Sequence, residues 1–151
     1  MSEVINLAAV LCRRFEGLRL KPYTCPAGVP TIGYGSTRYE DGTPVKLTDP
    51  EITKDRADEL LDRELSSFYQ SVVKYCPVLA ADSENKAAAI LSWTYNLGAG
   101  RLKASTMRKR INQQNWNAAA TELKRWVWGG GRRLPGLIVR RDAEAELLLS
   151  R

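Results

Sequence analysis

The chain has 151 residues, a net charge of +6 and a pI of about 9.4. A chain of this length can bury roughly two-thirds of its unfolded surface, so a stable core needs no disulfide or metal. Its apolar runs are shorter than the ~18 residues that a spanning helix requires, so we expect no stable membrane insertion. The basic charge favours an anionic partner, but it does not choose between nucleic acid, lipid head groups and the bacterial envelope.

The residue types restrict the chemistry further. The sequence contains no histidine, which excludes Ser–His–Asp and Cys–His relays. Zinc is left with few ligands, and we expect neither a metal nor a cofactor. The absence of a glycine-rich phosphate loop or an arginine–aromatic repeat argues against a nucleic-acid partner.

The first segment is predicted to be an amphipathic helix. Apolar residues recur at spacings of three and four between Val4 and Leu18, and Gly17 is placed to end the helix. The apolar run at residues 4–12 precedes Arg13 and Arg14, whereas a secretory signal carries its positive charge first. We therefore expect no export signal in this segment.

A small sheet and a helical region are predicted to follow. Prolines and glycines punctuate residues 22–47, which indicates a turn-rich antiparallel sheet with a hairpin at Asp41-Gly42. Thr48 and Glu51 form a candidate capping box that opens a long helix to about Tyr75. Asp82 is the expected cap of the next helix, which stops at Gly98 and Gly100. Shorter helices are expected at 105–113 and 116–127, and a last one at 137–149.

These elements predict an α+β fold within a single domain. Residues 1–47 form an N-terminal helix and a β subdomain, residues 48–75 a connecting helix, and residues 76–151 a helical lobe. At 1.5 Å per residue, the connecting helix is long enough to bridge two lobes.

Glu16 is the first candidate for chemistry. It lies at the end of the first predicted helix, on the apolar side with Cys12 and Phe15. Partial desolvation there favours the protonated carboxyl, which can then donate a proton. Position alone also fits an ordinary surface glutamate near a helix end.

The residues from Glu16 to Gly35 resemble a known active-site pattern. The segment resembles the active-site signature of phage-type lysozymes, glycoside hydrolase family 24. That signature has Glu-Gly, an aspartate after eight intervening residues, a threonine after five more, and then Gly-x-Gly. Glu16, Cys25, Thr31, Gly33 and Gly35 occupy these positions. A looser resemblance continues through Asn96-Leu97-Gly98, Ser105-Thr106 and Asn112, then through Leu134-Pro135-Gly136-Leu137 and Arg140-Arg141.

Two positions depart from the pattern. Cys25 replaces the usual aspartate, and Ser36 stands where a histidine often follows the second glycine. Some members of the family resemble this chain in using a Glu–Cys–Thr set. The resemblance implies that Glu16 protonates the glycosidic oxygen, Cys25 assists water and the Thr31 hydroxyl holds that water. A covalent intermediate on Cys25, or a purely structural role for Cys25, is left open.

We expect substrate contacts from Ser105, Trp128 and Arg140. Trp128 lies beside three glycines and is the best candidate for exposure, whereas the other tryptophans have core-like positions. The resemblance implies that Arg140 or Arg141 reaches Glu16. A Cys12–Cys25 disulfide that blocks the thiol is a further alternative, because Cys12 lies one helical turn before Glu16.

The resemblance implies a monomeric muramidase that acts on peptidoglycan and cleaves between N-acetylmuramic acid and N-acetylglucosamine. Lacking a visible export segment, it would accumulate in the host cytoplasm and reach the periplasmic wall through a holin-made lesion. Two alternatives stay open: a lytic transglycosylase, which needs only one glutamate, and a non-catalytic cationic wall-binding module.

Overall fold

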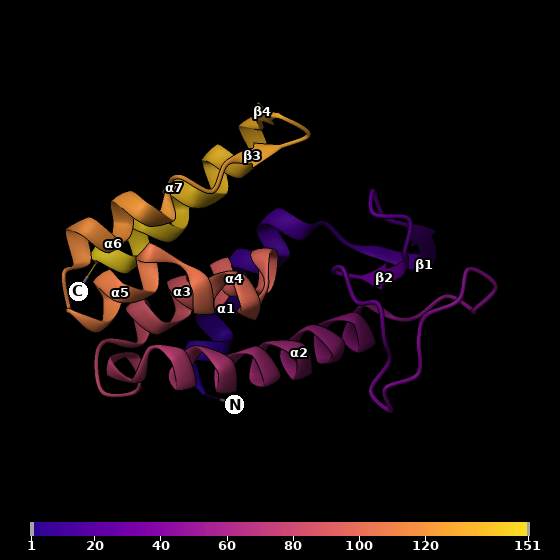
Figure 1. Ribbon diagram of the computed structural model, residues 1–151. Coiled ribbons are helices and arrows are strands. Elements are labelled where there is room, and N and C mark those ends of the chain that lie inside the picture. Colours follow the sequence, from indigo (N-terminus) through magenta and orange to yellow (C-terminus); the bar gives the residue numbers. More distant parts are fainter. Residues whose placement is uncertain (1, 151) are drawn as a thin grey trace.

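A computed structural model describes residues 2–150 of the chain. It has two lobes: a small one built on a β-hairpin and a larger helical one, joined by the long helix α2 (Lys54–Tyr75) (Figure 1). The α+β class predicted from the sequence is confirmed. Within residues 2–150, no helix combines the length and the apolar character needed to cross a membrane.

Helix α1 (Glu3–Glu16) carries the chain from the helical lobe to the small lobe. Its first turn is capped by the Ser2 hydroxyl, which accepts a hydrogen bond from the Ile5 amide. It ends at Gly17, where φ is +73°, a backbone conformation that glycine adopts without strain. The predicted stop is confirmed, and it leaves Glu16 as the last helical residue.

The small lobe contains a two-stranded antiparallel sheet, formed by β1 (Arg19–Thr24) and β2 (Pro30–Gly33). At Gly33, where φ is +68°, an added Cβ would lie 3.4 Å from the Cβ of Ala57, so β2 packs closely on α2. The predicted turn at Asp41-Gly42 is present. The residues on either side of this turn form one isolated β-bridge, between Arg38 and Pro44, and not a regular pair of strands.

The start of α2 differs from the prediction. The helix begins at Lys54, and its cap is Thr53, whose hydroxyl accepts a hydrogen bond from the Arg56 amide. The prediction of a helix from Thr48 was wrong because the preceding segment is held by other contacts. Asp49 accepts hydrogen bonds from the Lys46 amide and the Tyr39 hydroxyl, and the Ile52 amide donates to the Leu20 carbonyl in the sheet.

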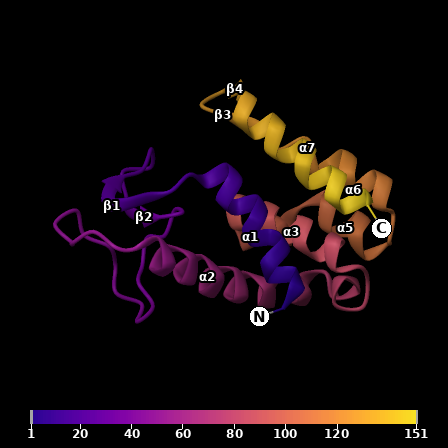
Figure 2. The ribbon, with the colours of Figure 1, turned by 180° about the vertical axis from the view of Figure 1, so that it is seen from behind.

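The helical lobe is arranged around α3 (Glu84–Leu97), which packs against α1, α2 and α7 (Pro135–Leu149) (Figure 2). Residues 87–94 of α3 are all buried. The cap of α3 is Ser83 and not Asp82, since the Asp82 carboxylate accepts a hydrogen bond from the Ser83 amide instead. The remaining elements are η1 (Pro77–Ala80), α4 (Ala99–Ala104), α5 (Thr106–Asn112), α6 (Trp116–Leu123), β3 (Trp128–Gly129) and β4 (Arg132–Arg133).

The position of the α2 cap gives a stability prediction. Replacing Thr53 with alanine removes the hydroxyl that caps the first turn, and we expect a loss of about 1 kcal/mol in the free energy of unfolding. Thr48→Ala, at the position that the sequence favoured, should change it by less than about 0.5 kcal/mol. Urea unfolding followed by circular dichroism measures both. A larger loss at Thr48 would contradict the assigned cap.

Candidate active site

A cleft of about 650 Å³ lies between the two lobes. Its walls come from the end of α1, the loop after β2, the middle of α2 and the end of α3. The lining residues are Glu16, Gly35, 37–40, Gly42, Leu60, Arg63, Glu64, Ser67, Phe68, Tyr95 and Asn96. Of the three catalytic candidates from the sequence, Glu16 lines this cleft.

The Glu16 side chain retains 21% exposure and lies against the C-terminal helix. Nη1 of Arg140, on α7, donates a hydrogen bond of 2.7 Å to its Oε2 atom. A Cβ added at Gly35 would lie 3.8 Å from Glu16 Oε1 and 3.8 Å from the Tyr95 hydroxyl, so Gly35 brings bare backbone close to the acid. One carboxylate oxygen is therefore held by a guanidinium, and the other faces the loop after β2.

Arg140 reaches Glu16 from a buried position. Its side chain is 3% exposed. The prediction was that Arg140 or Arg141 approaches the acid, and the structure places Arg140 there. It was also expected to contact substrate. Its burial directs the guanidinium to Glu16 and to protein groups behind the cleft, so its effect on substrate would pass through the acid.

Cys25 and Thr31 are brought together by the hairpin register. Tyr23 pairs with Thr31 and Thr24 with Pro30, and the Cys25 amide then donates to the Val29 carbonyl at 3.0 Å. Thr31 is buried, and its hydroxyl donates to the same Val29 carbonyl at 2.8 Å. Cys25 is partly exposed at the tip of the hairpin, and all three cysteines are free thiols in this structure.

The hairpin also changes the proton affinity of the thiol. Hydrogen bonding by the Val29 backbone, and then by the Thr31 side chain, lowers the pKa of Cys25. Burial raises the pKa of Tyr23, and the charges of Cys25 and Glu16 both add to that rise. Tyr23 is therefore within electrostatic range of both groups, which come from different elements. A cysteine whose thiolate is favoured and a carboxyl, both within electrostatic range of one tyrosine, can carry acid–base chemistry.

Residues 13–144 match a family model described as phage lysozyme. The chain belongs to the phage lysozyme family. This assignment makes it a glycoside hydrolase of the lysozyme class, with a muramidase-type lytic role on the cell wall.

Relatives of this phage lysozyme match it along most of their length. The SAR-endolysin of bacteriophage PS34 is 35% identical over 134 residues, which cover 89% of this chain and 76% of the relative. The endolysin of Salmonella phage P22 is 31% identical over 151 residues and covers 99% and 100% of the two chains. Among solved structures, an endolysin from Escherichia coli phage FAHEc1 has a TM-score of 0.86 at 33% identity and covers 99% of this chain and 94% of its own. The muramidase domain of SpmX from Asticaccaulis excentricus has a TM-score of 0.81 at 25% identity, with full coverage of both chains.

A second carboxyl, Glu64 on α2, also lines the lysozyme's cleft. Burial raises its pKa, and the nearby charge of Glu16 adds to the rise. The Tyr95 hydroxyl lies at the same part of the cleft and donates a hydrogen bond of 3.1 Å to the Tyr34 carbonyl, which links the helical lobe to the small lobe. Burial also raises the pKa of Tyr95. Neither Glu64 nor Tyr95 was predicted from the sequence, because Glu64 resembles an ordinary polar residue of an amphipathic helix and Tyr95 an ordinary residue of its apolar face.

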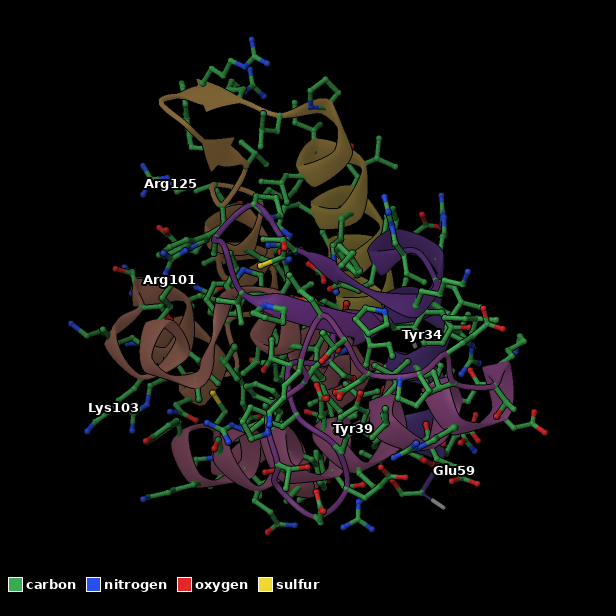
Figure 3. The ribbon with its side chains drawn as sticks, turned by 90° about the vertical axis from the view of Figure 1, so that its right-hand side faces the viewer. Tyr34, Tyr39, Glu59, Arg101, Lys103 and Arg125 are labelled. Atoms are coloured by element: carbon green, nitrogen blue, oxygen red, sulfur yellow. The ribbon has the colours of Figure 1, made fainter. Side chains whose placement is uncertain are left out.

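Ser105 and Trp128, both expected to contact substrate, differ in their exposure to solvent. Ser105 is buried, accepts a hydrogen bond from the Arg108 amide as the cap of α5, and donates one to the Leu102 carbonyl. Its hydroxyl is therefore used within the fold, and Ser105 is not among the residues that line the cleft. Trp128 is 62% exposed. It borders a hollow of about 490 Å³ together with Leu97, Arg101, Arg125 and Trp126, and Figure 3 shows Arg101 and Arg125 projecting from the same edge of the helical lobe.

Three polar residues that contact Arg140 or Arg141 were not predicted from the sequence. Ser92 and Asn96 are spaced by four on α3, and Glu144 follows Arg140 and Arg141 at spacings of four and three. Ser92 contacts Arg140, Asn96 contacts Arg141, and Glu144 contacts both arginines. The spacing was a usable signal, because residues three and four apart meet on one face of a helix.

The different surroundings of the three thiols predict that Cys25 is alkylated in preference to Cys12 and Cys76. At about pH 8, iodoacetamide should add one group to the folded protein, at Cys25, because its pKa is lowered and its side chain is accessible. Burial raises the pKa of Cys12 to about 12 and that of Cys76 to about 11, so both should stay unreactive thiols. Intact mass and peptide mapping measure the sites.

Two controls bracket this result. Folded Cys25→Ser should take up no group, and the denatured parent should take up three. Labelling of Cys12 at the rate of Cys25 in the folded protein would contradict the assignment.

Proposed function

We propose that this phage lysozyme hydrolyses the β-1,4 bond between N-acetylmuramic acid and N-acetylglucosamine of peptidoglycan, with Glu16 as the general acid. The observation that carries the proposal is the placement of Glu16 on the cleft, held by Arg140 at 2.7 Å. The guanidinium stabilises the carboxylate that remains after Glu16 gives its proton to the leaving oxygen. A glycan strand lying between the lobes would pass this carboxyl.

The second group of the proposed reaction is Cys25. In an inverting hydrolysis, a base on the opposite face of the sugar takes a proton from the attacking water. The lowered pKa of Cys25 supports this role, because it increases the thiolate fraction at neutral pH. The Thr31 side chain lies beside the thiol, and we assign it the positioning of that water. Attack by the thiolate itself, giving a covalent glycosyl intermediate, is the alternative.

The proposed function also includes contacts with the substrate and the route by which the enzyme reaches the wall. Trp128 offers an exposed ring on which a sugar can stack, and Arg101 and Arg125 beside it suit an anionic wall polymer. The matches to phage endolysins support lysis of a bacterial host from the periplasmic side of its membrane. We retain host cytoplasm and holin-dependent release as the route, and a monomer as the acting form.

The role of Glu16 is tested by Glu16→Gln, which keeps the size of the side chain and removes the transferable proton. We expect hydrolysis of purified peptidoglycan to fall by about 10²- to 10⁴-fold, the usual contribution of a general acid. New reducing ends in the parent reaction identify hydrolysis, and their count is the measurement. Products ending in 1,6-anhydro sugars would instead assign a lytic transglycosylase. Equal lysis by parent and variant would leave a wall-binding module without chemistry.

The role of Cys25 is tested by comparing aspartate and serine at this position. Cys25→Asp keeps a group that ionises, so we expect activity within about tenfold of the parent, whereas Cys25→Ser should lose about 10²-fold or more. A base must be deprotonated to act, and a carboxyl loses its proton at lower pH than a thiol. The acid limb of the pH–rate profile should therefore move to lower pH in Cys25→Asp.

Full activity of Cys25→Ser would remove Cys25 from the chemistry. A glycosyl adduct on Cys25, trapped in the parent and found by mass spectrometry, would favour the covalent alternative.

A further inference from the structure

Glu144, on α7, is a buried carboxylate with no place in the reaction described above. Its side chain has no exposed surface, yet it lies among charged groups. Its Oε2 atom accepts a hydrogen bond of 2.6 Å from the Ser92 hydroxyl and one of 3.3 Å from Arg140 Nε. Its Oε1 atom forms an ion pair of 2.8 Å with Arg141 Nε. Burying a carboxylate costs free energy unless the charge is paired, and the contacts of Glu144 provide that pairing.

The contacts of Glu144 form two branches that lead to the cleft. Through Arg140, the first reaches Glu16 at 2.7 Å. Through Arg141, the second reaches Asn96, whose side-chain oxygen accepts a hydrogen bond of 2.8 Å from Nη2. Asn96 lines the same cleft as Glu16. One carboxylate thus fixes two adjacent arginines, and each arginine holds a different residue on the wall of the cleft.

The charges of this group balance. When Glu16 is ionised, Arg140 and Arg141 supply two positive charges and Glu16 and Glu144 supply two negative ones, so the net charge is zero. Arg140 also donates to the Ser92 carbonyl at 3.2 Å and lies 3.6 Å from the Cys12 sulfur. Without Glu144, the positive charge of Arg140 would be balanced by Glu16 alone.

We propose that Glu144 is a positioning residue for the glycosidase reaction: it divides the charge of Arg140 between two carboxylates and fixes Arg141 against Asn96. This inference rests on the proposed function of Glu16. With Glu144 in place, Glu16 shares the guanidinium of Arg140 with a second carboxylate. If Glu144 loses its charge, Arg140 holds the ionised form of Glu16 more strongly, and less acid is available for donation.

The other titratable groups that face this cluster come from each packed element. Cys12 on α1 is buried beside Arg140, and its raised pKa, about 12, keeps it neutral. Glu64 on α2 and Tyr95 on α3 lie within electrostatic range of Glu16. Cys12 and Tyr95 are neutral, and the ion pairs of Arg140 within residues 2–150 are with Glu16 and Glu144. Loss of the Glu144 charge therefore leaves Arg140 paired with Glu16 alone.

The test is Glu144→Gln, which keeps the shape of the side chain and removes its charge. We expect kcat on purified peptidoglycan at pH 7 to fall about tenfold, and the alkaline limb of the pH–rate profile to move about one unit lower, the effect typical of a nearby charge. KM should rise, because Asn96 is less firmly held. The matched control is Glu146→Gln, an exposed glutamate on the same helix, which should leave all three quantities unchanged.

The outcomes separate this inference from the proposed function. A parent that produces no new reducing ends would defeat the proposed function, and the role of Glu144 with it. An active parent, with Glu144→Gln matching Glu146→Gln in kcat, KM and pH profile, would overturn the inference alone. If Glu144→Gln does not fold, Ser92→Ala decides, because it removes the 2.6 Å hydrogen bond to Glu144. It should move the alkaline limb lower by a smaller amount, and an unchanged limb in a folded Ser92→Ala would overturn the inference.

Discussion

A guanidinium that is almost fully buried is the constraint on which the site depends. Arg140 is 3% exposed, and removing a cation from water costs several kcal/mol unless carboxylates compensate. Glu16 compensates from the cleft and Glu144 from beneath it. The contacts that make the burial of Arg140 tolerable therefore also fix the acid. Because Arg140 comes from α7 and Glu16 from α1, the ion pair at the proposed reaction centre forms only when the last helix is packed against the first.

The residues proposed to activate water are positioned differently. Cys25 and Thr31 are placed by backbone pairing in a two-stranded sheet, and β2 packs on α2 through the close approach of Gly33 to Ala57. The acid thus belongs to a dense, charge-balanced interior, and the proposed base belongs to a hairpin tip. This division explains why Cys25 is partly exposed with a lowered pKa, whereas Cys12 is buried and its pKa is raised.

Sequence periodicity predicted the longer helices and the small sheet, and it placed the end of α1 at Gly17. It missed α4 (Ala99–Ala104), which contains Gly100, an expected helix stop, and it extended α6 to residue 127, whereas the helix ends at Leu123. It failed at the start of α2 and of α3, where several residues compete to cap a helix and tertiary contacts of Asp49 and Ile52 decide. Of the site, Glu16 and its arginine were predicted, through a resemblance more than through their own chemistry. Glu144, Ser92 and Asn96 were not, because a buried polar residue is defined by partners that lie far away in the sequence.

The hydrogen bond from the Tyr95 hydroxyl to the Tyr34 carbonyl spans the two lobes. A hinge motion that widened the cleft would break it. One such bond contributes about 0.5–1.5 kcal/mol net, which corresponds to roughly a two- to tenfold bias in an equilibrium. This contact is therefore a weak link between the two lobes. It favours their present arrangement, and binding of a long polymer between them could break it at little energetic cost.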